Sequence, residues 1–140
     1  MIINQISVFL ENKAGQLKEV ISVLADNNID LRAINVAEAQ EYGVIRFIVD
    51  DYGLACDALK KHEYVFRTTP VVVVATKDEV GGLAKLLDAI NESEFNIEYM
   101  YSIFSQISDR ALMVFKVDDA NKLENLLVTK GYNSVDIGIK

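Results

Sequence analysis

The sequence predicts an α+β protein built from two ferredoxin-like β-α-β-β-α-β units, each with an antiparallel sheet and its helices on one face. Strand-like alternation and helix-like spacing follow one another in that order twice along the 140 residues. The second half also repeats landmarks of the first. Gly15 and Leu17 match Gly81 and Leu83 at a spacing of 66 (81 − 15 and 83 − 17), which indicates a duplicated unit.

The first unit is expected over residues 1–68. Alternation within 2–10 predicts a strand with one buried apolar face and with Gln5 and Ser7 on the other side. The remaining elements expected in this unit are a helix over 17–25, a strand over 29–37, a hairpin loop at 38–43, a strand over 44–49, a helix over 54–59 and a strand from Tyr64.

The second unit is expected over residues 69–140. Its expected elements are strands over 71–75, 97–104, 111–117 and 132–139, and helices over 83–90 and 123–127. Phe47 and Tyr64 match Phe115 and Tyr132 at a spacing of 68 (115 − 47 and 132 − 64), which places two extra residues in the second hairpin. The aspartates at 50–51 and 118–119 are candidate N-caps, and Gly131 is a candidate C′ residue.

A glycine-bearing loop opens the first helix of each unit, at 12–17 and at 78–83. The first backbone N–H groups of such a helix are free, and together with the helix dipole they form a small anion site. Glycine also lets a ligand approach the backbone closely. The competing interpretation is that Asn12 and Asp78 only cap their helices.

The composition excludes several classes of function. The chain carries 14 basic and 21 acidic residues, a net charge of −7, which disfavours nucleic acid and anionic membranes as partners. No apolar run approaches the roughly 20 residues of a membrane span, and the first residues lack the features of a signal peptide, so we expect a cytoplasmic protein.

Catalytic and metal chemistry are also disfavoured. Cys56 and His62 are the only residues of their types, which argues against a zinc site or a Cys–His pair. The sequence contains no P-loop or Rossmann glycine pattern. We therefore expect no catalytic residues, no metal and no cofactor, and hence no enzyme.

The loops carry a resemblance to a known family. A first strand, then Asp/Asn-x-x-Gly-x-Leu, then a turn at 28–30 or 95–97 that leads into the second strand, resembles the ACT domain. ACT domains are small regulatory modules that bind amino acids. The resemblance covers both halves, so the chain is similar to a stand-alone tandem ACT protein. It departs at Ala14 and Val80, where the family often has proline.

The resemblance implies a sensor that binds a free amino acid at these loops. The ligand carboxylate would accept hydrogen bonds from loop amides, and short polar side chains would hold its ammonium. The candidate ligand-binding residues are Asn12, Ala14, Gly15, Gln16, Leu17, Asp30, Asp78, Val80, Gly81, Gly82, Leu83, Asn96 and Met100. Met100 is included because, in the family, its strand commonly lies at the seam between modules.

The resemblance also implies a homodimer, with an enzyme of amino-acid metabolism as a further partner. ACT modules often pair through their second strands, which would separate the joined strands of this chain by roughly 29 Å. The four residues 67–70 reach at most about 14 Å. We therefore expect either a second chain or an exchange in which 64–67 and 71–75 form a hairpin. The alternative function is a regulatory or structural subunit that binds a partner enzyme without ligand.

Overall fold

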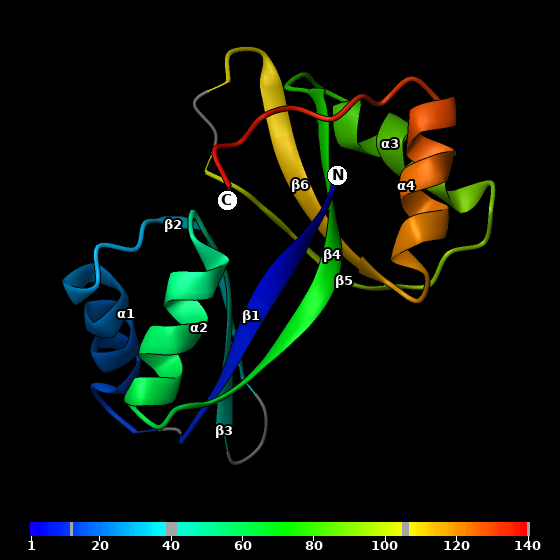
Figure 1. Ribbon diagram of the computed structural model, residues 1–140. Helices are drawn as coiled ribbons and strands as arrows, with labels where there is room; N and C mark the ends of the chain where they lie inside the picture. Colours follow the sequence, from blue (N-terminus) through cyan, green and yellow to red (C-terminus); the bar gives the residue numbers. More distant parts are fainter. Residues whose placement is uncertain (12, 39–41, 105–106, 140) are drawn as a thin grey trace. The chain divides into compact units, whose positions relative to one another are not determined.

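The structure is a computed structural model of the chain, and it describes residues 1–11, 13–38, 42–104 and 107–139 (Figure 1). Its elements are β1 (Ile2–Glu11), α1 (Gln16–Asp26), β2 (Leu31–Glu38), β3 (Tyr42–Val49), α2 (Tyr52–Lys61), β4 (Val65–Lys77), α3 (Gly82–Asn91), β5 (Ile97–Ser102), β6 (Arg110–Val117) and α4 (Ala120–Thr129). None of the described helices is long and apolar enough to cross a membrane.

The chain folds into two compact units, and each unit combines segments that are separate in the sequence. The first unit comprises Asn4–Thr69 and the residues from Gly138 onward, and the second comprises Met1–Ile3 and Pro70–Ile137. The chain passes between them within β4, at Thr69 and Pro70. The expected division of the chain into domains over residues 1–68 and 69–140 remains a prediction.

In the first unit, the strands neighbour one another in the order β2-β3-β1-β4. Both partners of β3 are antiparallel to it: β1 pairs from Ile6↔Phe47 to Glu11↔Tyr42, and β2 from Leu31↔Val49 to Glu38↔Gly43. This is the order expected of a β-α-β-β-α-β unit.

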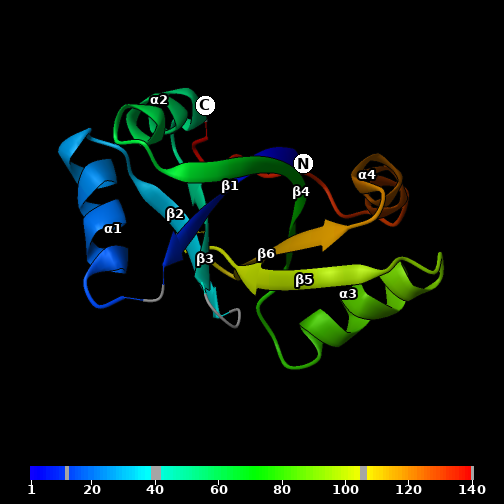
Figure 2. The same ribbon diagram turned by 90° about the horizontal axis from the view of Figure 1, so that it is seen from below.

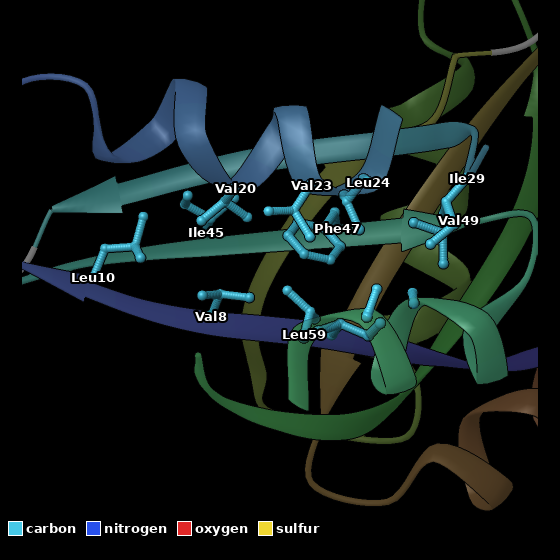
Figure 3. Packing of buried hydrophobic residues seen from close by; sticks show 13 residues of the cluster. Val8, Leu10, Val20, Val23, Leu24, Ile29, Ile45, Phe47, Val49 and Leu59 are labelled. Atoms are coloured by element: carbon cyan, nitrogen blue, oxygen red, sulfur yellow. The ribbon is translucent and has the colours of Figure 1, made fainter. Parts of the chain in front are cut away.

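The first core lies where alternate residues of β1 and β3 meet the apolar stripes of α1 and α2 (Figure 3). The buried members are Ile6, Val8, Leu10, Val20, Val23, Leu24, Ile29, Ile45, Phe47, Val49, Ala55, Ala58 and Leu59. Figure 3 shows Phe47 among Val23, Leu24 and Leu59, which come from the two helices. The period of two in the strands and of 3.6 in the helices thus converges on one cluster.

In the second unit, the strand order is β1-β4-β6-β5 (Figure 2). β6 pairs antiparallel with β4, from Val72↔Phe115 to Lys77↔Arg110, and with β5, from Ile97↔Val117 to Ser102↔Met113. The buried core residues here are Val72, Val74, Leu86, Ile90, Phe115, Val117, Leu123 and Leu127.

The predicted last strand over 132–139 is wrong, because these residues form no strand. The N-terminus of the chain occupies the position beside β4 instead. Val73 N donates to Met1 O at 2.8 Å, and the Met1 ammonium donates to Val73 O at 3.1 Å. That ammonium also lies 3.8 Å from a Glu124 carboxylate oxygen. The second unit therefore departs from the expected β-α-β-β-α-β order at its end.

Of the two expected arrangements, the one in which 64–67 and 71–75 form a hairpin is wrong. Val65–Lys77 is one continuous strand, with Pro70 inside it. No turn is needed, because the first part of β4 belongs to the first unit and the rest belongs to the second.

The polar side of β1 is buried rather than open. Gln5 is 0% and Ser7 is 6% exposed, and the Gln5 amide donates to the Ser7 hydroxyl at 3.2 Å. The predicted alternation of β1 is correct. Its polar face is buried as well, and hydrogen bonding limits the free-energy cost of burying it.

The duplication is confirmed by equivalent hydrogen bonds. Asp51 Oδ1 accepts from Leu54 N at 3.1 Å, and Asp119 Oδ1 accepts from Lys122 N at 3.0 Å, so the second aspartate of each pair is the N-cap. Gly131 follows the C-cap of α4 with φ 88°, as expected of a C′ residue.

Replacing Asp119 by alanine should lower the free energy of unfolding by about 0.5–2 kcal/mol, because α4 loses its side-chain cap. Urea unfolding followed by circular dichroism measures the change. Asp118→Ala is the matched control, since the cap hydrogen bond comes from the neighbouring residue. Equal losses in the two variants would contradict this assignment.

Candidate functional site

Both predicted loops place a left-handed glycine at the N-cap of a helix. Gly15 has φ 87° and Gly81 has φ 83°, and neither helix start receives a side-chain cap hydrogen bond. The interpretation of Asp78 as a helix cap is therefore wrong, whereas Asn12 lies outside the described residues. Glycine is needed here because other residues are strained at this φ.

Gly82 carries a second constraint that is specific to the second unit. A Cβ on Gly82 would lie 2.3 Å from Lys77 O, so α3 starts in direct contact with the end of β4. The Thr76 hydroxyl donates to Gly82 O at 3.3 Å and fixes this approach. The first unit has Gln16 at the equivalent position, so its loop cannot pack in the same way.

A cavity of about 320 Å³ lies beside Gly82. It is lined by Ala75, Thr76, Lys77, Glu79, Gly82, Lys85, Arg110, Gly131, Tyr132, Asn133 and Val135. Three of these side chains are cationic and one is anionic. Glu79 lies 3.7 Å from the Lys85 ammonium. The segment expected to be the last strand therefore forms one wall of this cavity.

A second cavity, of about 490 Å³, adjoins the first and shares Lys77, Glu79 and Arg110 with it. It adds Asp78, Ser108 and Asp109 to the lining. Asp78 N donates to Asp109 O at 3.0 Å, which joins the loop to the β5–β6 connection. Cationic and anionic groups thus lie side by side at the predicted loop.

The corresponding place in the first unit has a different chemistry. The spacing of 66 puts Glu11 and Glu19 where the second unit has Lys77 and Lys85 (77 − 11 and 85 − 19). Tyr64, the equivalent of Tyr132, donates from its hydroxyl to Glu19 Oε1 at 2.9 Å. Burial, followed by the contact with Glu19, raises the pKa of Tyr64 to about 12.

Glu11 is also engaged at its own loop. The Lys13 ammonium lies 2.6 Å from a Glu11 carboxylate oxygen. This hydrogen-bonded pairing lowers the pKa of Glu11 and raises the pKa of Lys13. Both groups are solvent-exposed, so the pair adds little to stability.

Asn96 is not brought together with Asp78 inside the second unit. Asn96 directly precedes β5, whose Ile97 pairs with Val117, whereas the Asp78 loop follows Lys77, which pairs with Arg110. Asn96 and the Asp78 loop therefore lie at opposite ends of β6, which are more than roughly 20 Å apart at about 3.3 Å per residue.

Asp30 is placed in the same way at the far end of its unit. Its backbone N–H donates to Asp50 Oδ1 at 2.9 Å, and its carboxylate lies 3.7 Å from Arg32 Nε. Because Leu31 pairs with Val49 while Glu11 pairs with Tyr42, Asp30 and the Gly15 loop lie at opposite ends of β3.

The other predicted residues divide between surface and core. Val80 is fully exposed, Leu17 and Leu83 are exposed in part, and Ala14 is exposed on its turn. Met100 is partly buried against the second core. Tyr99 and Tyr101 stack on β5, with ring centroids 6.4 Å apart, as alternate residues on one face of a strand can.

The sequence did not single out five residues that line the two cavities: Lys77, Lys85, Asp109, Arg110 and Tyr132. The signal for Lys77 and Lys85 was the exchange of charge with Glu11 and Glu19 at matched positions of the repeat. Among the described residues, no group of three or more His, Cys, Asp and Glu side chains could hold a metal ion.

The fold is a tandem of small α+β modules, each with a glycine-bearing loop at the start of a helix. The family model described as ACT domain pair matches residues 1–137. The chain therefore belongs to the ACT domain pair family, a regulatory module. No curated protein matches the sequence.

Solved structures agree with this assignment. A protein from Bacteroides thetaiotaomicron is 36% identical, with a TM-score of 0.90 over 99% of this chain and 94% of that chain. The ligand-free regulatory subunit of aspartate kinase from Thermus thermophilus is 16% identical, with a TM-score of 0.64 over 92% of this chain and 94% of that chain. The subunit from Thermus flavus has a TM-score of 0.58 at 16% identity, with the same two coverages. The last two matches show a shared fold.

Gly82→Ala should destabilise the protein by about 1–3 kcal/mol or more, because the added Cβ meets the backbone at Lys77 O. Chemical denaturation measures the loss. Gln16→Ala is the matched control in the first unit and should be close to neutral. A Gly82→Ala variant as stable as the wild type would show that α3 can move away from β4 at no cost.

Tyr64 should make stability fall in alkaline solution. Its folded pKa, about 12, exceeds the ordinary 10.0, so its contribution is complete below pH 10 and is lost as the pH rises toward 12. Urea midpoints of wild type and Tyr64→Phe, taken at pH roughly 8 and roughly 11, test this. Other tyrosines and lysines titrate in both proteins, so only the difference between them reports Tyr64. An identical fall in both would refute the prediction.

Proposed function

We propose that the protein is a non-catalytic sensor that binds a free amino acid at the Gly81 loop of the second unit. Binding would be passed on through oligomerisation or through a partner enzyme. The observation that carries this proposal is the pair of adjoining cavities, one rich in cations and one rich in carboxylates, at a glycine-capped helix start. A zwitterion is the ligand that such an arrangement complements.

The carboxylate of the ligand fits the cavity beside Gly82. Arg110 and Lys77 supply charge-assisted hydrogen bonds. Gly82 lines this cavity and has no side chain that would keep the ligand away from the backbone.

The ammonium of the ligand fits the adjoining cavity, where Asp78 and Asp109 supply anionic acceptors. Asp78 thus keeps the role that the sequence predicted for it, now with Asp109 as a second acceptor. Cavity volumes of about 320 and 490 Å³ lie within the range of roughly 300–1,000 Å³ typical of small-molecule sites.

The first loop is proposed as the weaker of the two. Its acidic side chains, Glu11 and Glu19, would repel a ligand carboxylate, and Glu19 is already bonded to Tyr64. The residues predicted there, 12–17 and Asp30, therefore contribute less to binding in this proposal.

A homodimer completes the proposal. Asn96 and the Gly81 loop lie at opposite ends of β6, so Asn96 reaches a ligand at this loop only from a second copy of the chain. Met100 on the neighbouring strand would then support that contact. The fold shared with aspartate kinase regulatory subunits supports an enzyme of amino-acid metabolism as the further partner.

A thermal-shift screen of the twenty amino acids tests the proposal. A ligand at 100 times its Kd adds about 2.7 kcal/mol of apparent stability, which is readily detected. Asp78→Ala should weaken binding of the active amino acid by about tenfold or more, because the ammonium loses a charged acceptor. Asn12→Ala, at the matched position of the first loop, should have a smaller effect.

Two results would contradict these expectations. Absence of any shift would favour the alternative of a regulatory subunit that binds its partner without ligand. Equal losses at Asp78 and Asn12, measured by calorimetry, would show that the ranking of the two loops is wrong.

A further inference from the structure

We propose that the ligand of the second unit is an amino acid with an acidic side chain. This inference rests on the proposed function and names the class of ligand for the same site. It follows from a surplus of positive charge in the cavity beside Gly82.

The cavity holds more cations than one ligand carboxylate needs. Lys77, Lys85 and Arg110 line it, while Glu79 is the only acid in the lining. Glu79 lies 3.7 Å from Lys85, beyond hydrogen-bond distance, so the Lys85 ammonium keeps its donors for a ligand. Three cations and one carboxylate give this lining a net charge of +2 (3 − 1), which a ligand offsets with its α-carboxylate between Lys77 and Arg110 and its side-chain carboxylate at Lys85.

Two of these cations lie directly opposite each other in the sheet. Lys77 pairs with Arg110 at the last position of the β4–β6 ladder. Directly opposed residues point to the same face of a sheet, and like charges in such a pair destabilise it. An anion bound between them would turn this repulsion into two favourable contacts.

The repeat shows that the fold does not impose this charge. In the first unit, the equivalent ladder position pairs Glu11 with Tyr42. Glu19 takes the place of Lys85 and accepts a hydrogen bond from Tyr64. The same backbone frame therefore carries acids in one unit and bases in the other.

The positive cavity also stands out against the chain as a whole, whose net charge is −7. General surface charge would attract cations and not anions. A cluster of three bases in such a protein marks a local preference for a negatively charged group.

The ammonium of the ligand determines how the ligand is oriented in the site. Asp78 and Asp109 line the adjoining cavity, whose lining does not include Lys85. An acidic amino acid with its ammonium at these carboxylates can direct its α-carboxylate toward Lys77 and Arg110 and its side-chain carboxylate toward Lys85. A neutral amino acid brings no carboxylate to Lys85.

Isothermal titration calorimetry on the full chain tests the inference with L-glutamate and L-aspartate against their amides, L-glutamine and L-asparagine. The amides match the acids in shape and differ in charge. At least one acid should bind about tenfold or more tightly than its amide, and its affinity should fall as salt is added. If both amides bound as tightly as their acids, the inference would be overturned and the proposed function would stand.

Glutarate and succinate separate this inference from the proposed function. They carry two carboxylates and no ammonium. If they bound as tightly as the acidic amino acids, the site would be a dicarboxylate site and the proposed function would be overturned. Absence of binding by all of these compounds would overturn the inference, and the screen of the twenty amino acids would then decide the proposed function.

The Lys85→Gln variant tests whether Lys85 is the base that contacts the side-chain carboxylate of the ligand. The preference for the acid over its amide should fall toward one, while affinity for the amide stays unchanged. Lys61→Gln, an equal change of charge on α2, is the matched control and should retain the full preference. Both lysines are exposed, and thermal unfolding verifies that the variants fold. A full preference in Lys85→Gln would contradict the assignment.

Discussion

The backbone pairing of the N-terminus with β4 is the interaction on which the second unit depends. Met1 and Val73 exchange two hydrogen bonds, and they fill the position beside β4. In the first unit, the equivalent position beside β1 is taken by the early part of β4 itself. One long strand thus serves as the last strand of one unit and the first strand of the other.

This arrangement explains why the second unit has a cavity walled by a segment without strand structure. β1 begins opposite Val73, and the residues after α4 form no strand. Gly131, Tyr132, Asn133 and Val135 line the space beside Gly82 instead. In the first unit, the matching residues begin β4, and Tyr64 there bonds to Glu19. The two units therefore differ in the pairing of their last segment and also in the residues that this segment places beside the loop.

Local features of the fold could be predicted from sequence because they rest on nearest-neighbour chemistry. Periodicity located the helices, the aspartate pairs located the caps at Asp51 and Asp119, and the glycines marked the left-handed turns. The strand expected over 132–139 failed for a physical reason. Alternation indicates that a segment can form a strand, but pairing requires a free edge, and that depends on residues far away in sequence.

The site was predictable only in part, for a similar reason. The loop over 78–83 was visible as a motif, whereas Lys85, Arg110 and Tyr132 join it through helix geometry and sheet register. Register also separates Asn96 from the loop, although the family resemblance groups the two. Only the antiparallel order of β4, β6 and β5 shows which of these residues share one end of the sheet.

The two loops show how little of the ligand chemistry is decided by the backbone. Gly15 and Gly81 have nearly the same φ, and each accepts the first helical hydrogen bond at 3.0 Å, from Glu19 and Lys85 respectively. The donors of these equivalent bonds belong to side chains of opposite charge. Membership of the ACT domain pair family therefore locates the loops, while the side chains around them decide what can bind. After duplication, a few exchanges of charge at fixed positions are enough to give two equivalent frames loops of opposite charge.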